Sequence, residues 1–85
     1  MTAPDTRAVF LEELSHVAPD IDPGTVGDHD HIQDDLDLDS MDVLNLVAAL
    51  HARLGIDIPE RDYPEISTPH RAAAYLSSRV GAKTR

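Results

Sequence analysis

The sequence has no cysteine and few aromatic residues, which are Phe10, Tyr63 and Tyr75. The absence of cysteine excludes disulfides, cysteine-ligated zinc sites and thiol catalysis by the chain's own side chains. With so few rings the core must be aliphatic, and small helical bundles can be built from Leu, Val, Ile and Ala. A chain of 85 residues makes one small domain, too small for a deep catalytic cleft. A binding, carrier or adaptor protein is therefore expected.

Basic residues are missing from much of the chain, since no Lys or Arg lies between Arg7 and Arg53. The formal net charge of −9 argues against binding to nucleic acid, whose phosphates require basic side chains, and against anionic membranes. Partners steered by charge should carry basic surfaces. No apolar run approaches membrane-spanning length, and residues 1–7 lack the apolar segment of a signal peptide. We therefore expect a cytoplasmic protein without membrane insertion.

The first part of the chain predicts one helix followed by a long loop. Helical spacing of apolar residues runs to Val17, with Pro4 suited to the first turn and with Glu12 and Glu13 on the polar face. Pro and Gly then punctuate residues 18–38. We expect this loop to be ordered, because isolated aliphatic side chains can anchor it to the bundle: Ile21, Val26, Ile32 and Leu36.

The remaining sequence predicts two helices and a short helical turn between them. The second helix should begin at Asp39 or Ser40 and end at Leu54. It is apolar over most of its circumference, so either other helices surround it or a partner covers part of it. A short turn interrupted by a proline is expected in 60–66, and Thr68 should cap a last helix that starts at Pro69.

The acidic run 34–42 surrounds Ser40 and admits several interpretations. The alternation that starts at Asp35 resembles a calcium loop, but Ser40 and Leu46 stand where an EF-hand loop needs Gly and Glu. Enzymes that use paired aspartates need a larger fold and a substrate pocket. We therefore assign neither catalytic residues nor metal ligands here, and a solvated acidic loop is the plain interpretation.

Ser40 has two interpretations, an ordinary helix-start serine or a point of covalent attachment. Asp39 can supply the helix cap, which leaves the Ser40 hydroxyl free. A phosphate attached there would lie at the positive end of the helix, where free N–H groups favour an anion. The apolar helix that follows offers a docking surface, so the second interpretation is favoured.

The segment LDLDSMD at 36–42 resembles the acyl carrier protein family, whose signature is Asp-Ser-Leu or Asp-Ser-Met at the start of the second helix. The resemblance extends over about 26–76. It implies an all-α fold, a small four-helix bundle with a short third helix and a long loop between helices 1 and 2. We expect one carrier domain over 1–85, ordered over roughly 4–80, with a frayed tail at 81–85.

The resemblance also implies a function. A phosphopantetheinyl transferase would attach 4′-phosphopantetheine from coenzyme A to Ser40, and the thiol of this arm would carry acyl groups as thioesters. The protein itself would be a monomer and not an enzyme. Its other partners would be acyl-loading enzymes, ketosynthases, transferases or thioesterases with basic docking surfaces. The residues implied to meet partners are Asp37, Asp39, Met41, Asp42 and Asn45, and those implied to line the interior are Leu44, Val47, Ala48, Ile58, Tyr63, Ile66, Ala72 and Tyr75.

The second helix departs from carriers of primary fatty acid synthesis, because their acidic strip is replaced here by Asn45, His51 and Ala52. Tyr63 is also bulky where the family often has a small residue, which would narrow an acyl pocket. Fatty acid, polyketide and specialised lipid biosynthesis all remain open, and the departures favour a dedicated pathway. The alternatives are an aminoacyl or peptidyl carrier protein and an unmodified acidic helical adaptor.

Overall fold

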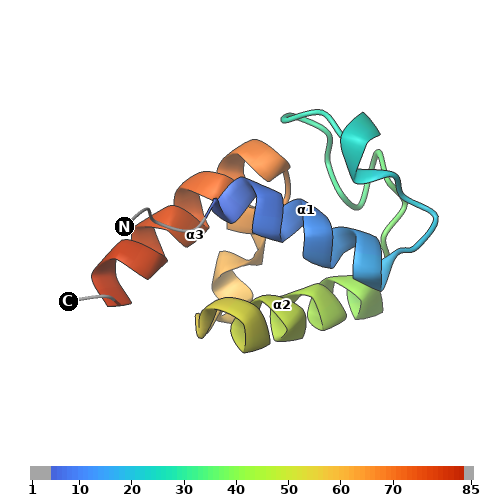
Figure 1. Cartoon of the computed structure of the whole chain (residues 1–85). Coiled ribbons are helices and arrows are strands. Elements are labelled where there is room, and N and C mark those ends of the chain that lie inside the picture. Colours follow the sequence, from blue (N-terminus) through green and yellow to red (C-terminus); the bar gives the residue numbers. More distant parts are fainter. Residues whose placement is uncertain (1–4, 84–85) are drawn as a thin grey trace.

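The computed structural model describes residues 5–83, which form three α-helices and two 3₁₀ helices and contain no strand. The elements are α1 (Thr6–Val17), η1 (Pro23–Thr25), α2 (Ser40–Leu54), η2 (Glu60–Ile66) and α3 (Pro69–Lys83), as Figure 1 shows. The all-α prediction with a short third helix is confirmed. Pro4 and residues 84–85 lie outside the described residues. The backbone of α3 continues to Lys83, whereas fraying was expected from Gly81.

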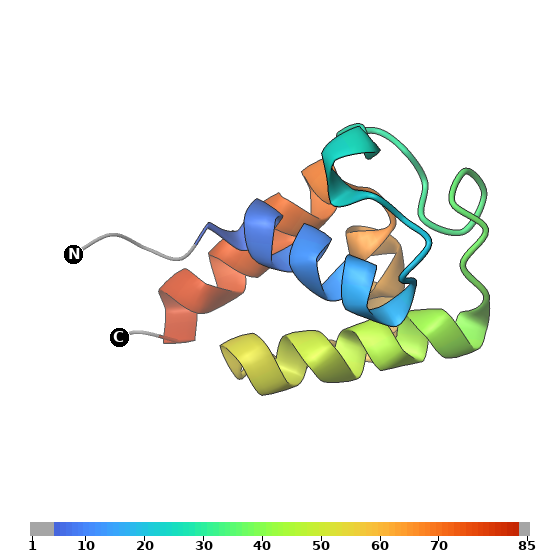
Figure 2. The same ribbon diagram turned by 45° about the vertical axis from the view of Figure 1, so that its right-hand side comes forward.

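The central helix of the bundle is α1, which packs against both α2 and α3 (Figures 1 and 2). It begins after Asp5, whose carboxylate accepts the N–H of Ala8 at 3.2 Å. Phe10 and Leu14 point into the core and are fully buried. The apolar faces of α2 and α3 are therefore buried against α1, because the core-facing residues of α1 lie between these two helices.

The first alternative for α2, that other helices surround it, is wrong. Its buried apolar side chains form one stripe, Val43, Leu46 and Leu50. Met41 and Leu44 are 63% and 47% exposed on other faces of the helix. A single neighbouring helix covers only one stripe, so much of the apolar circumference of α2 remains at the surface.

The implied interior positions are only partly confirmed. Ile58, Ile66 and Ala72 are buried, and Val47, Tyr63 and Tyr75 are half-buried against the core. Leu44 and Ala48 are exposed, so their assignment to the interior is wrong. Both line pockets that α2 shares with η2. No described helix is long and apolar enough to cross a membrane.

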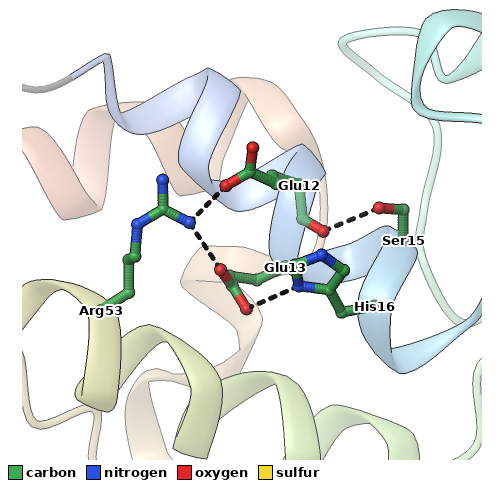
Figure 3. A network of polar contacts seen from close by, with 5 residues as sticks. All are labelled: Glu12, Glu13, Ser15, His16 and Arg53. Atoms are coloured by element: carbon green, nitrogen blue, oxygen red, sulfur yellow. Dashed lines mark hydrogen bonds and ion pairs between the residues drawn. The ribbon is translucent and has the colours of Figure 1, made fainter.

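An ion-pair network joins the C-terminal end of α2 to α1 (Figure 3). The prediction that Glu13 lies on the polar face is wrong, because its side chain is only 12% exposed. Arg53 donates from Nη1 to Glu13 Oε2 at 2.7 Å and also to Glu12. His16 Nδ1 lies 3.3 Å from Glu13 Oε1. A carboxylate so far from water needs a cationic partner, and Arg53 supplies it.

This network predicts how stability depends on pH. The hydrogen bond from Arg53 lowers the pKa of the Glu12 carboxyl below its usual 4.5. A group with a lowered pKa stabilises the fold above its unfolded-state value, and that contribution is lost as the pH falls through the folded-state value. Arg53→Gln should therefore be less stable than the parent protein at neutral pH, and the gap should narrow as the pH falls below 4.5.

Urea unfolding at a series of pH values measures this gap. Arg61→Gln is the control, since it removes an exposed arginine that forms no ion pair with a described residue. A gap between Arg53→Gln and the parent that stays constant down to pH 3 would contradict the assignment.

The long loop before α2 is held by backbone hydrogen bonds to residues at and just before the start of α3. Ile32 N donates to Ser67 O at 2.9 Å, and His70 N donates to Asp28 O at 2.9 Å. The anchors Val26 and Ile32 are buried as expected, whereas Ile21 and Leu36 are half-buried. Leu38 is the buried anchor that was not expected, at 4% exposure. It fixes the chain directly before α2 begins.

The predicted boundaries of α2 and the predicted start of the last helix are confirmed. Gly55 ends α2 in the left-handed region with φ of 69°, where a side chain would be strained. Thr68 Oγ1 accepts the N–H of Arg71 at 3.2 Å and so caps α3. The helical turn in 60–66 is a continuous 3₁₀ helix that contains Pro64, so this proline does not interrupt it.

Candidate functional site

The N-terminus of α2 is held by a capping box made of two aspartates. Asp39 Oδ1 accepts the N–H of Asp42 at 2.8 Å, and Asp42 Oδ2 accepts the N–H of Asp39 at 3.4 Å. The reciprocal bonds fix the direction in which the chain enters the helix. The cap expected from Asp39 is confirmed, and the participation of Asp42 was missed, although the Asp-x-x-Asp spacing indicates it.

Ser40 occupies the first position of α2 and is exposed. Because Asp39 caps the helix, the Ser40 hydroxyl is not needed for that role. The N–H groups of Ser40 and Met41 lie in the first turn, where no intrahelical acceptor is available. An exposed hydroxyl therefore stands next to free N–H groups at the positive end of a helix.

The other residues expected to meet partners surround Ser40 but differ in their exposure and in their hydrogen bonding. Met41 and Asn45 are exposed on α2, and Asp37 is exposed in the loop with a positive φ of 62°. Asp39 is exposed while its carboxylate holds the cap. Asp42 is half-buried, and its carboxylate accepts the backbone N–H of Asp39, so its charge is less accessible to a partner.

A pocket of about 690 Å³ opens beside Ser40. The loop before α2, the first turns of α2, η2 and the start of α3 form its wall. Its lining residues are His31, Ile32, Gln33, Ser40, Val43, Leu44, Glu60, Tyr63, Pro64, Ser67 and Arg71. Tyr63 was expected to narrow such a pocket, but the polar residues of the wall were not predicted. They come from distant segments, so no sequence spacing connects them.

The acidic run shows no arrangement of metal ligands. Within residues 5–83, no three His, Asp or Glu side chains are placed to hold a metal ion. Two of its aspartates serve the backbone instead, in the capping box described above. Asp35 also accepts the N–H of His31, at 2.8 Å. Part of the acidic run therefore serves to hold the backbone by hydrogen bonds.

Comparison with known proteins decides the family. The model of the family described as "Phosphopantetheine attachment site" matches residues 8–76. The chain belongs to the acyl carrier protein family. It is 32% identical over 77 residues to the acyl carrier protein of Helicobacter hepaticus, covering 91% of this chain and 95% of that one.

Two further matches come from a solved structure and from a longer protein. The acyl carrier protein from Enterococcus faecalis superposes with a TM-score of 0.70 at 31% identity, covering 87% of this carrier protein and 98% of that chain. A segment of the non-reducing polyketide synthase Preu3 of Preussia isomera is 30% identical over 71 residues. The match covers 84% of this carrier protein and 3% of the synthase.

The family fixes the cofactor and the kind of activity. Its cofactor is 4′-phosphopantetheine, and its members are carriers rather than catalysts. The start of α2 fits this group, because an exposed hydroxyl, unpaired N–H groups and an open pocket meet there. The phosphopantetheine arm supplies a terminal thiol that holds acyl groups as thioesters.

Proposed function

We propose that Ser40 is the residue to which phosphopantetheine is attached, and that the protein carries acyl groups on this arm. The observation that carries the proposal is the exposed hydroxyl at the first position of α2, next to the pocket. Two other serines have their hydroxyls engaged in hydrogen bonds. The hydroxyls of Ser15 and Ser67 donate to the carbonyls of Glu12 and Pro64, at 2.7 and 2.8 Å.

The residues around Ser40 have separate tasks in this proposal. Asp39 holds the turn so that the hydroxyl faces solvent, where a phosphopantetheinyl transferase can reach it. The first-turn N–H groups stabilise the attached phosphate. Asp37 attracts a basic partner surface, and Met41 and Asn45 provide uncharged contact on α2.

We further propose that the pathway is polyketide or specialised lipid biosynthesis rather than primary fatty acid synthesis. Between Val43 and Leu54, α2 carries no carboxylate, so the basic surfaces of primary-pathway enzymes would find little charge there. The similarity to a segment of a polyketide synthase supports this direction. Enzymes that load, extend, transfer or release the acyl group are the proposed partners, in the cytoplasm.

Intact-mass measurement after incubation with coenzyme A, Mg²⁺ and a broad-specificity phosphopantetheinyl transferase tests the attachment. The parent protein should gain the mass of one phosphopantetheine, and Ser40→Ala should gain none. Ser67→Ala is the matched control, because Ser67 lines the same pocket but its hydroxyl is bonded to Pro64. No gain in the parent protein, or a gain that persists in Ser40→Ala, would refute the proposal.

A further inference from the structure

The pocket beside Ser40 carries several polar side chains in a wall that is otherwise mostly apolar. Charged or hydrogen-bonding side chains come from three segments: His31 and Gln33 from the loop, Glu60 from η2 and Arg71 from α3. An alkyl group placed among them would displace their water without replacing its hydrogen bonds.

The interior behind this pocket is already filled. Leu46, Leu50 and Ile66 are fully buried, and Ile32 is 2% exposed. Leu44, which lines the pocket, is 47% exposed. A bound chain would therefore rest in a cleft that is open to water, in contact with both apolar carbon and polar groups.

Hydrogen-bond donors are available on this wall. The Arg71 guanidinium has five N–H groups, and its ion pair with Glu65, at 3.4 Å, lies between two half-exposed side chains. His31 Nδ1 accepts the backbone N–H groups of Gln33 and Asp34, both at 3.2 Å. A neutral His31 thus carries its proton on Nε2, where it can donate. The Gln33 side chain adds a further amide donor.

The charges around the pocket disfavour a free carboxylate as the bound group. Glu60 lines the pocket, Glu65 already pairs with Arg71, and Asp34 and Asp37 lie in the loop before α2. An added anion would meet these carboxylates and would have to compete with Glu65. Neutral oxygens accept hydrogen bonds without that repulsion.

From this wall we infer that the pocket binds acyl groups that carry neutral carbonyl or hydroxyl oxygens, with Arg71 as the residue that selects them. The inference rests on the proposed attachment at Ser40. It names a substrate class, oxygenated acyl chains, in preference to plain alkyl chains and to chains that end in a carboxylate.

Three acyl groups of equal carbon number test the inference. The transferase would load butyryl, acetoacetyl or succinyl arms from the corresponding coenzyme A thioesters, and intact mass would confirm each product. Nitrogen-15 NMR then follows the side-chain signals of Arg71 and Gln33, relative to the protein with an unacylated arm. Acetoacetyl should shift both signals, while butyryl and succinyl should leave them within error of the unacylated form.

Two arginine variants complete the test. Arg71→Gln should remove the acetoacetyl-induced shift of Gln33, and Arg79→Gln, outside this pocket, should retain it. The acetoacetyl thioester should also hydrolyse at least twofold faster on Arg71→Gln than on the parent, with no difference for butyryl. Equal shifts for the three acyl groups, or no shift with the acetoacetyl group, would overturn the inference alone. Absence of any mass gain would overturn the attachment at Ser40 as well.

Discussion

Phe10→Ala is expected to remove a large part of the stability of the fold. Phe10 is fully buried in α1, the helix that packs against both α2 and α3. Truncating a buried Phe costs about 3 to 5 kcal/mol, because the cavity closes only partly. A domain of this length has roughly 4 to 13 kcal/mol of unfolding free energy in total. Urea unfolding followed by far-UV circular dichroism should show a transition at much lower urea.

The matched control for Phe10→Ala is Leu44→Ala, which truncates a large apolar side chain that is 47% exposed. It should change the unfolding free energy by less than about 1 kcal/mol, since little apolar area leaves the core. Equal losses in the two variants would show that α1 is not the centre of the packing.

Removing two charges near Ser40 is expected to slow its modification. Asp34→Asn/Asp37→Asn keeps the side-chain shape, and Asn tolerates the positive φ found at Asp37. The loop would then attract a basic transferase less strongly. Because steering by an acidic surface raises association rates by tenfold or more, kcat/KM for the transferase should fall by about tenfold at low salt. The rate is measured by intact mass over time.

The control for this charge effect is Asp5→Asn/Asp57→Asn, which changes the net charge equally. Asp5 precedes α1, where Asn can still cap the helix, and Asp57 follows the opposite end of α2, about 21 Å along its axis from Ser40. This variant should lose far less activity. At about 1 M salt the two variants should become equal, because the Debye length is then about 3 Å. An equal loss in both variants at low salt would point to net charge instead of a local surface.

Local signals in the sequence predicted the ends of the helices well. Gly55 and the Thr68–Pro69 pair mark boundaries through conformations that depend on adjacent residues only, and the structure places them as expected. Asp39 is a cap for the same reason. Composition and these local signals were therefore sufficient to predict the all-α fold and the exposed position of Ser40.

Packing between distant segments was not predictable in the same way. Apolar residues all round α2 suggested a central helix, but periodicity alone does not say which face meets α1. Glu13 looked like a surface residue because its partner, Arg53, is forty positions away. The pocket wall was unpredictable for the same reason, since only the tertiary fold brings Gln33 and Arg71 into one pocket with Ser40.

The network of Glu12, Glu13 and Arg53 bears on attempts to exchange partners by transplanting α2 between carrier proteins. A foreign α2 without Arg53 would leave the nearly buried Glu13 of α1 without a cation. Conversely, this α2 placed in a carrier that lacks acids at the positions of Glu12 and Glu13 would bring an arginine without carboxylate partners. A chimera should therefore exchange Glu12, Glu13 and Arg53 together with the helix, or replace Glu13 by an uncharged residue.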